Sequence, residues 1–494
     1  MVLLEASAPF CDFCARFALP LVTLLIPVVI IFTVEVKTGR FARFLLVSGR
    51  SVGSSERVFA AKSMAIRDDN KVRFDSAQER PCVELALDDI AYISSVGNTM
   101  EVRCFETPKW GIYRVIIGAR RVYREYRISC CSPEKAKEFA GGLSKASKLF
   151  SERHDSKLHL IVNPVSGAPG TSLQVVNRIE AVLRAANQPY IITITTARGH
   201  AKRIGMSWNS AIDGDCAICV GGDGLLHEFI NGVMIRRSTG CKSGEPLIAV
   251  VAAGSGNGVA KSLGFDVFDV ESSTLAILKR KVTPFDLMSC QFSGCDRNEC
   301  AQPVYSIASV QHGIIADVDY KSERFRFMGS IRFHLEAILQ IFIFRPVCIS
   351  LSAQNATRNL VPGSRFDTLG GNISKTGKWT NIMVSNVPYI THDMKFAPLA
   401  HHCNGTADLV TLGNVRRWPL LWDIFLRVED GAHINTETAK CHGRIHRITS
   451  IQISPGDTRE QPARVMYDID GEFFWSSGAV VIKVVPGAIN VICA

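Results

Sequence analysis

The stretch CAICVGGDGLLHEFINGV (216–233) decides how the central part of this chain folds. It begins with an apolar run of strand length and ends with apolar residues at helical spacing. The turn Gly221-Gly222-Asp223-Gly224 separates the two. A strand that ends in a glycine turn and continues into a helix is half of a βαβ unit. We therefore expect a mostly parallel sheet here, covered by helices on both faces.

The same alternation surrounds this stretch. LHLIVN (158–163), YIITITT (190–196) and LIAVVAA (247–253) are apolar and β-rich, and helical spacing follows each of them. From about Thr283 onward strand-like runs dominate, with one helical exception near 322–344 and a polar stretch at 353–379 that is typical of a surface insertion. The sequence predicts an α/β nucleotide-binding catalytic domain at 156–281 and a β-rich domain at 282–494.

Two further segments precede these domains. Residues 55–150 contain short β runs closed by one helix that opens at Ser132-Pro133, which predicts a small PH-like β domain. Residues 1–54 form a hydrophobic segment in which the 18 residues Phe17 to Val34 carry no charge. A helix needs ~20 such residues to span a bilayer, and Pro20 and Pro27 interrupt this run. We expect buried strands or an interfacial anchor, and spanning stays an alternative.

Composition narrows the class of protein. The 494 residues are 47% hydrophobic and 21% charged, which is ordinary globular composition and excludes disordered, collagen-like and disulfide-scaffold proteins. The formal charge of +10 suits an acidic partner such as ATP, a phospholipid surface or nucleic acid. The 16 cysteines form no paired framework, which favours reduced thiols in the cytosol.

Three glycine loops follow strands of the α/β half, at residues 163–167, 221–224 and 254–258. In an open α/β sheet the carboxyl ends of the strands form the ligand crevice, and free N–H groups at helix starts bind phosphate. A single loop of this kind would be explained as a tight turn. Three such loops after successive strands of the α/β half predict a nucleotide-binding site. GxxxxGK[ST] is absent and Val259 breaks GxGxxG, so neither a P-loop enzyme nor a dinucleotide-dependent dehydrogenase is favoured.

Asp223 is the candidate catalytic residue. Glycine on both sides leaves room for a ligand beside its carboxylate, which could take a proton from an attacking hydroxyl. The alternative is that Asp223 only caps the following helix. His227 lies among Leu226, Phe229 and Ile230, so we expect a packed helix residue rather than a base.

The segments NPVSG (163–167), VGGDGLLHEFINGV (220–233) and AAGSGNGVAKSL (252–263) together resemble the diacylglycerol-kinase-type lipid kinases, and most of all the sphingosine kinases among them. The resemblance runs from about Leu158 to the end of the sequence. It implies an α/β nucleotide domain and a β-sandwich lipid domain with the active site between them. GGDG alone also occurs in NAD kinases and phosphofructokinases, so the three segments in order carry the resemblance.

The resemblance also implies roles for individual residues. Asp223 would deprotonate the primary hydroxyl of the lipid, Asp319 would hold its amino-alcohol head, and Ser309 and Asp317 would lie nearby. Because Asp317 and Asp319 are two residues apart, they share one face if the segment is extended. The implied nucleotide-binding residues are Asn163, Pro164, Val165, Thr195, Arg198, Gly199, Gly222, Gly224, Ser255, Gly256, Asn257, Arg326, Arg332, Asp470, Gly471 and Glu472.

Some of these positions have a plainer explanation. On sequence alone Asp470-Gly471-Glu472 is equally a hairpin turn, and Arg326 and Arg332 are surface charges. The chain also departs from the family: no Lys or Arg follows NPVSG within 168–172, Gly221 replaces a usual Ser, and Gly258 replaces the Asp common in diacylglycerol kinases. The last departure favours a sphingoid substrate.

We therefore predict an ATP- and Mg²⁺-dependent kinase of sphingosine or another long-chain base, whose product is sphingosine 1-phosphate or its analogue. The alternatives are a ceramide or diacylglycerol kinase, or a membrane-binding scaffold with an inactive kinase half. We expect a lipid substrate and a membrane surface as partners, no nucleic acid, and a cytoplasmic protein with peripheral or anchored membrane association. No protein-bound metal is predicted. The helical residues expected to line a tail slot are Phe325, Phe327, Met328, Phe333, Leu335 and Ile338.

Overall fold

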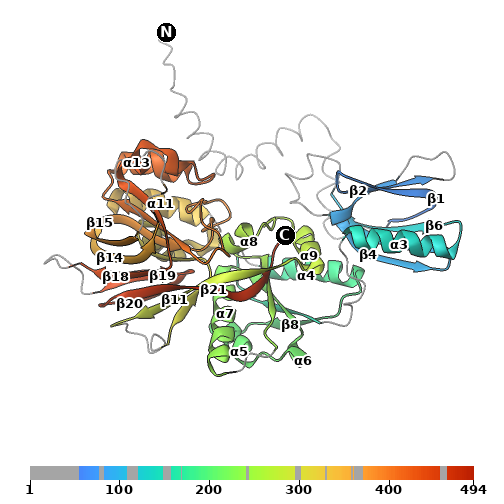
Figure 1. Cartoon of the computed structure of the whole chain (residues 1–494), viewed down its shortest axis with the longest axis horizontal. Coiled ribbons are helices and arrows are strands. Elements are labelled where there is room, and N and C mark those ends of the chain that lie inside the picture. Colours follow the sequence, from blue (N-terminus) through green and yellow to red (C-terminus); the bar gives the residue numbers. More distant parts are fainter. Residues whose placement is uncertain are drawn as a thin grey trace, which may run out of the picture. The chain divides into compact units, whose positions relative to one another are not determined.

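The computed structural model describes residues 55–76, 83–107, 121–147, 157–167, 170–240, 244–294, 302–328, 331–357, 360, 371–456 and 464–494 (Figure 1). The predicted hydrophobic segment 1–54 lies outside these ranges, so its structure is not described. Among the helices that are described, none combines the length and the apolar character needed to cross a bilayer. The described ranges all belong to one compact unit, Ser55–Ala494.

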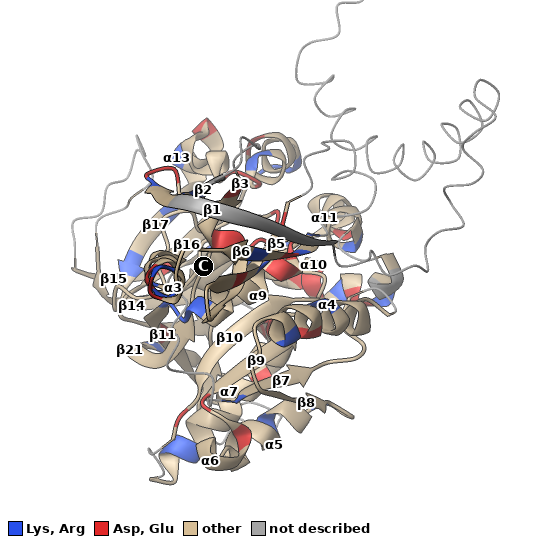
Figure 2. Cartoon of the chain, turned by 90° about the vertical axis from the view of Figure 1, so that its right-hand side faces the viewer, with Lys and Arg blue, Asp and Glu red and all other residues tan. Residues whose placement is uncertain are grey.

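The α/β part is built on four parallel strands in the order β8-β7-β9-β10. Because β7 and β9 are covered on both faces, their residues are buried throughout. Helix α4 packs against α9 and α5 packs against α7, and Figure 2 shows these two pairs on either side of the strands. The elements are β7 (Leu158–Val162), α4 (Thr171–Ala185), β8 (Tyr190–Ile194), α5 (His200–Ser207), α6 (Ser210–Asp213), β9 (Cys216–Gly221), α7 (Asp223–Ser238), β10 (Leu247–Ala252), α8 (Gly258–Ser262) and α9 (Val270–Lys279).

The C-terminal part is built of antiparallel strands that continue the same sheet. Its strands are β11 (Val282–Phe292), β12 (Val304–Ser306), β13 (Ser309–Gly313), β14 (Val347–Ala356), β15 (Gly371–Ser385), β16 (Ala407–Gly413), β17 (Gly443–Ile448), β18 (Ser450–Pro455), β19 (Val465–Ile469), β20 (Glu472–Ser476) and β21 (Val480–Ile492). Helical segments cover one side: α10 (Ile314–Ser322), η4 (Glu323–Met328), α11 (Ile331–Ile343), α12 (Arg417–Pro419), η5 (Leu420–Ile424), η6 (Phe425–Arg427), η7 (Ala432–Asn435) and α13 (Glu437–His442).

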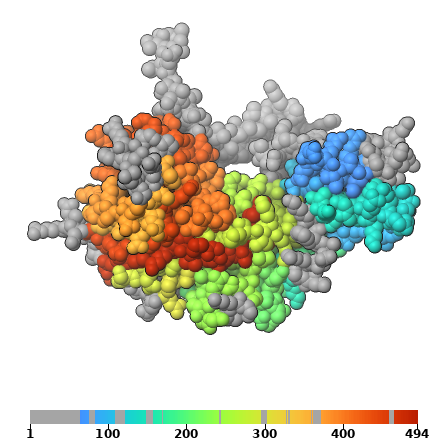
Figure 3. Space-filling model, viewed as in Figure 1, coloured from blue at the N-terminus to red at the C-terminus, as the bar shows by residue number. Residues whose placement is uncertain are grey.

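Strand β21 joins the two parts. Along most of its length it pairs with β11 and β18, and at its far end Val491 pairs in parallel with Ile248 of β10. Figure 3 shows the C-terminal residues in red as a band that reaches from the β-rich part to the α/β part. The two parts therefore share one continuous sheet.

Residues 55–147 form a separate six-stranded sheet in the order β3-β2-β1-β6-β5-β4 with one helix against it. Its elements are β1 (Ser55–Arg67), β2 (Lys71–Ser76), β3 (Val83–Ala86), η2 (Leu87–Asp89), β4 (Ile90–Val96), β5 (Thr99–Glu106), β6 (Val122–Ser129) and α3 (Pro133–Ser147). Arg121 contacts both Asp89 of this domain and Asp269 before α9. Contacts of α9 with η2 and β4, and of α4 with β4 and β5, likewise place this domain against the outer helices α4 and α9.

Candidate active site

A cavity of about 1000 Å³ lies where the glycine loops of the α/β part meet α10, α11 and β13 of the C-terminal part. All three predicted loops reach it. Its polar end is formed by the first residues after β7, β9 and β10, and its other end by apolar side chains of the C-terminal part. The strand ends therefore build the crevice that the sheet topology leads us to expect.

The loops touch one another through their backbones. A Cβ atom on Gly254 would lie 2.4 Å from Gly222 Cα, and one on Gly167 would lie 2.6 Å from the carbonyl oxygen of Ala253. No side chain fits at these contacts, which explains the glycines. No described residue accepts a hydrogen bond from the backbone N–H of Ser255 or of Gly256, and both residues line the cavity. Unpaired N–H groups beside an open space are suited to phosphate oxygens.

Asp223 is the first residue of α7, and Gly222 is the N-cap, so the capping alternative is wrong. Its carboxylate accepts the N–H groups of a different helix, from Gly258 at 2.9 Å and from Val259 at 3.1 Å. Burial raises the pKa of Asp223 to about 6, although these two N–H donors oppose the rise. A carboxylate that is ionised at neutral pH and has this pKa can accept a proton from a hydroxyl group.

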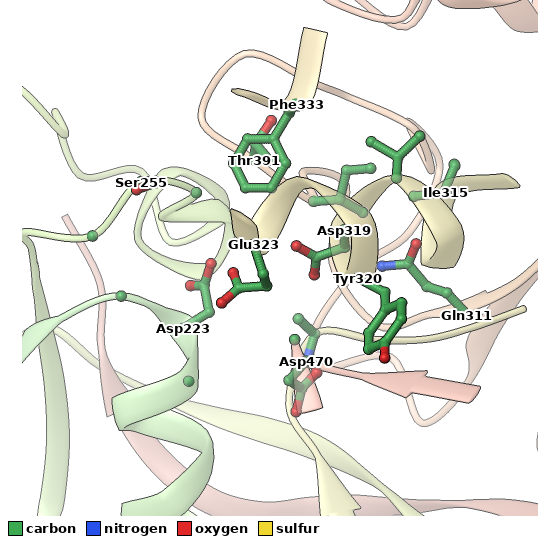
Figure 4. A pocket seen from close by; sticks show the side chains of 18 of the residues that line it. Asp223, Ser255, Gln311, Ile315, Asp319, Tyr320, Glu323, Phe333, Thr391 and Asp470 are labelled. Atoms are coloured by element: carbon green, nitrogen blue, oxygen red, sulfur yellow. Dashed lines mark hydrogen bonds between the residues drawn. The ribbon is translucent and has the colours of Figure 1, made fainter. Parts of the chain in front are cut away.

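A second group of carboxylates faces Asp223 across the cavity. Figure 4 shows Asp319 and Glu323 turned toward the same space as Asp223. Arg332 is buried between them, with Nη1 on Glu323 and Nη2 4.0 Å from Asp319 Oδ1. Burial raises the pKa of Asp319 to about 6, and the charge of Arg332 opposes this rise. Asp468, buried behind Asp319, has a pKa well above its ordinary value for the same reason.

The prediction that Asp317 accompanies Asp319 is wrong. Both residues lie in helix α10, where positions two apart point in different directions, so only Asp319 lines the cavity. Asp317 instead pairs with Lys321 one turn later, at 2.6 Å. The expectation of an extended segment is the source of this error.

Asp470-Gly471 forms the turn between β19 and β20 and also lines the cavity. The segment is therefore both the hairpin turn and the part of the site that the sequence analysis gave as alternatives. Both residues have positive φ, 54° and 86°, as a type I′ hairpin requires. Both oxygens of Asp470 are occupied by donors from the protein, among them the N–H groups of Ile307 and Ser309. Although burial alone would raise its pKa, His227 and the backbone N–H donors hold the pKa of Asp470 below its ordinary value. Asp470 therefore organises the wall of the cavity and has no oxygen left for a ligand.

The far end of the cavity is apolar. Among the expected tail-slot residues whose side chains the structure describes, Phe333 lines the cavity, whereas Phe325, Met328, Leu335 and Ile338 do not. Leu335 faces outward from α11, and the side chain of Phe327 lies outside the described part of the structure. The apolar wall comes instead from α10, the inner face of α11, the segment that follows β15, and η5 and η6. Its residues are Ile314, Ile315, Val318, Ala337, Ile341, Ile390, Met394, Phe396, Leu412, Leu420, Ile424, Phe425 and Val428.

Most of the predicted nucleotide and substrate residues line the cavity. These are Asn163, Pro164, Val165, Thr195, Arg198, Gly222, Asp223, Gly224, Ser255, Gly256, Ser309, Asp319, Arg332, Asp470, Gly471 and Glu472. Gly199 and Asn257 do not: the N–H of Gly199 donates to Glu228, and the side chain of Asn257 bonds both backbone groups of Gly254. The side chain of Arg326 lies outside the described part of the structure.

The sequence reasoning missed several residues at the site. Glu323, Thr391, Tyr320 and Gln311 line the cavity. Glu323 and Tyr320 follow Asp319 within five positions, so reading that segment as a helix would have placed Glu323 one turn beyond Asp319. Thr391 carries no comparable signal, because its position depends on a loop that packs on α8 through backbone contacts with Gly256 and Asn257.

The polar end fits a nucleotide triphosphate by its donors. Arg198 and the free N–H groups of Ser255 and Gly256 face the same end as Asp223. Among the described residues no group of three or more His, Cys, Asp or Glu side chains is placed to hold a metal ion. Mg²⁺ bound to the phosphates of a nucleotide would neutralise part of their charge at this end of the cavity.

Comparison with protein families gives two matches in succession. Residues 157–290 match the diacylglycerol kinase catalytic domain. Residues 308–493 match the YegS C-terminal NAD kinase beta sandwich-like domain.

Several curated proteins are similar to this chain. Sphingosine kinase 1 of Arabidopsis thaliana is 26% identical over 353 residues, which cover 66% of this chain and 70% of the relative. Sphingoid long chain base kinase 4 of Schizosaccharomyces pombe is 25% identical over 340 residues, 64% of this chain and 70% of the relative. Human sphingosine kinase 1 is 31% identical over 200 residues, 38% of this chain and 48% of the relative.

Among solved structures, a diacylglycerol kinase from Bacillus anthracis covers 69% of this chain and 97% of its own, with 17% identity and a TM-score of 0.47. The two family matches follow one another in the order that the strands and loops led us to expect. Residues 157–290 therefore carry a diacylglycerol kinase catalytic domain, and residues 308–493 carry a YegS-type C-terminal β-sandwich-like domain.

Proposed function

We propose that this protein transfers the γ-phosphoryl group of ATP to the primary hydroxyl of sphingosine or of another long-chain base. One observation carries the proposal: a single cavity has free N–H donors and Asp223 at one end, apolar side chains at the other, and the partly buried carboxylate of Asp319 between them. A long-chain base has the matching order of groups, with a hydroxyl and a cationic amine at one end of an apolar chain.

The proposed reaction needs one proton acceptor and charge neutralisation. The lipid hydroxyl oxygen forms a bond to the γ-phosphorus, the bond between that phosphorus and the β,γ-bridging oxygen breaks, and ADP leaves with the electron pair. Asp223 takes the hydroxyl proton, and Mg²⁺ on the phosphates supplies positive charge. The N–H groups of Ser255 and Gly256 orient the phosphates, and Arg332 lies across the cavity.

The preference for an amine rests on Asp319. Asp319 is partly buried, and a carboxylate that loses contact with water is costly unless a cation pairs with it. A sphingoid ammonium group would supply that cation. Diacylglycerol and ceramide have no cation to offer.

A neutral substrate remains a second candidate, because Arg332 already lies 4.0 Å from Asp319. If Arg332 alone satisfies Asp319, a ceramide or diacylglycerol head would be accepted equally well. The deciding experiment offers sphingosine, ceramide and diacylglycerol together with radiolabelled ATP and Mg²⁺, and separates the products by thin-layer chromatography. We expect label in the long-chain base product with the natural protein and none with Asp223→Asn. Label in no lipid would favour the inactive scaffold.

We also propose that the protein is cytoplasmic and meets a membrane surface peripherally. Helix α11 supports this: its inner face lines the cavity through Phe333 and Ile341, and its outer face exposes Leu339 and Phe342. Trp418 packs edge-on against Phe342 and is 61% exposed. Arg345, Arg416 and Arg417 are exposed beside them, which suits anionic headgroups. The β domain at 55–147 is proposed to be PH-like and to assist in this targeting.

A further inference from the structure

Helix α7 carries a row of polar residues that points into the C-terminal part. Asp223, His227 and Asn231 are spaced by four residues, so they lie on one face of the helix. His227 and Asn231 are buried, being 6% and 7% exposed. Buried polar side chains are retained where they have partners, and here the partners belong to the other part of the molecule.

His227 contacts the carboxylate of Asp470. Its Nδ1 lies 2.8 Å from Asp470 Oδ2, and its Nε2 lies 3.3 Å from Nδ2 of Asn231. The ionised carboxylate of Asp470 only accepts hydrogen bonds, so Nδ1 of His227 carries a proton and donates it to Oδ2. The amide nitrogen of Asn231 donates its own two hydrogens to the carbonyl oxygens of His227 and Tyr305. His227 is thus held in place as a hydrogen-bond donor to Asp470.

Asp470 also binds the segment that forms one wall of the cavity. Its Oδ1 accepts hydrogen bonds from Ser306 Oγ and from the N–H groups of Ala308 and Ser309, and its Oδ2 accepts the N–H of Ile307, all between 2.8 and 3.0 Å. Ala308 and Ser309 line the cavity, as do Gly471 and Glu472 next to Asp470. Four consecutive residues of the lipid-side wall are therefore attached to one carboxylate, which His227 contacts from α7.

Asn231 reinforces the attachment one turn later. Its Oδ1 accepts the N–H of Tyr305 at 2.9 Å, and its Nδ2 donates to the carbonyl oxygen of the same residue at 2.8 Å. The side chain thus pairs with the backbone of β12 as a neighbouring strand would. Both bonds run from α7 to the segment that leads into Ser306 to Ser309.

From these contacts we infer that His227 is a positioning residue for phosphoryl transfer: it sets the distance between Asp223 and the wall of residues 306–309, across which the acceptor hydroxyl must lie. The inference rests on the proposed function for the nature of the reaction. It assigns His227 no proton to transfer. A displacement of about 1 Å at a reacting centre can cost about 10²-fold in rate, so a loose wall should lower kcat more than it alters binding.

Three variants at one position test this. His227→Asn keeps an N–H donor where Nδ1 stands, His227→Gln moves the amide to the place of Nε2, and His227→Ala removes both. We expect the Ala and Gln variants to lose about 10- to 100-fold in kcat with a KM for ATP within about threefold, and the Asn variant to keep most of the rate. The acid limb of the kcat–pH profile should stay where the natural protein has it, because protonation of Asp223, and not of His227, stops the proton transfer.

Hydrogen exchange gives a readout that does not depend on activity. The amides of Ile307, Ala308 and Ser309 should exchange faster in His227→Ala and His227→Gln than in the natural protein, while His227→Asn should match it. Equal exchange in all four proteins, an Asn variant as slow in catalysis as the Ala variant, or an acid limb that moves with His227 would overturn the inference. If the natural protein phosphorylates no lipid, the proposed function fails, and the exchange rates still decide whether His227 holds this wall.

Discussion

The carboxylate of Asp223 faces the start of helix α8, where Gly258 donates its backbone N–H to Asp223 Oδ2 at 2.9 Å. The acid from one glycine loop is therefore held in place by the loop that follows the next strand. This contact fixes one oxygen and leaves the side chain beside the open space that Ser255 and Gly256 also line. The arrangement orients the acid before any substrate arrives.

Replacing Asp223 with Asn should abolish most lipid phosphorylation. The amide cannot accept the hydroxyl proton, although its oxygen can still accept one of the N–H groups from α8, so the fold should survive. Loss of a general base costs about 10²- to 10⁴-fold in rate. The measurement is kcat with the preferred lipid, and thermal unfolding serves as the control for folding. A variant within threefold of the natural rate would remove Asp223 from the mechanism.

The rate should fall in acid in a way that depends on the lipid. The pKa of Asp223 is raised to about 6, so below this pH the base becomes protonated and inactive. The pKa of Asp319 is also raised to about 6, so the site for an amine loses its charge in the same range. For a long-chain base kcat/KM should therefore fall toward a slope of two in a log–log plot, and for a neutral lipid toward a slope of one. Equal slopes would argue against Asp319 as the amine site.

Asp319→Asn should alter the choice of substrate. Without its charge the residue loses a charge-assisted hydrogen bond worth about 1.5 to 3 kcal/mol, so KM for sphingosine should rise about 10- to 100-fold. A neutral lipid should be bound as before or better. The matched control is Asp317→Asn, because Asp317 lies in the same helix, does not line the cavity and pairs with Lys321. The two variants should differ in KM for the amine and agree for diacylglycerol.

Two glycines of the loops should respond differently to alanine. A Cβ atom on Gly224 meets nothing within 4 Å, whereas one on Gly254 would lie 2.4 Å from Gly222 Cα. Gly224→Ala should keep its melting temperature and raise KM for ATP, because the methyl group enters the cavity. Gly254→Ala should lose stability by about 1 to 3 kcal/mol. Unfolding curves and KM for ATP, measured on both variants, test the contact between the two loops.

The outer face of α11 should govern attachment to vesicles. Burying an aromatic or aliphatic side chain contributes about 1.5 to 3 kcal/mol, so Trp418→Ser combined with Ile343→Ser should weaken binding to phosphatidylcholine–phosphatidylserine vesicles by at least about tenfold. Ile212→Ser is the control, because Ile212 is 67% exposed on α6. Activity toward a detergent-dispersed lipid should be unchanged in all these variants. Unaltered sedimentation of the double variant with vesicles would remove this face from the proposal.

The polar end of the site could be predicted from the sequence, because the glycine loops that form it are recognisable there. Each loop follows an apolar strand, and parallel strands bring their carboxyl ends together whatever the helices do. Asn163, Asp223 and Ser255 therefore reach one cavity as predicted. Residues far apart in the sequence can be predicted to lie together when they follow neighbouring strands of one parallel sheet.

The apolar end could not be predicted in the same way. Its residues between Ile390 and Val428 come from short helical turns and loops whose positions depend on tertiary packing. Asp317 was also placed wrongly, because it shares a face with Asp319 only in an extended segment, whereas both residues lie in helix α10. Gly258 gives a related lesson: a Cβ atom there would lie 2.6 Å from the carbonyl oxygens of Tyr389 and Ile390. Its identity is set by packing, so it carries no information on the lipid.

The sharing of one sheet by both domains has a consequence for how the molecule assembles. Strand β21 supplies Val491 as the neighbour of Ile248 in β10, and the Cys493 N–H bonds the carbonyl oxygen of Lys281 at 2.9 Å. Strand β10 of the α/β part is therefore covered only by residues that lie more than 200 positions later in the chain. Contacts between residues so far apart in sequence slow folding. During synthesis, β10 would stay an open edge. A version of the chain that stops before Val480 should accumulate in aggregates even though every loop of the phosphate site is present.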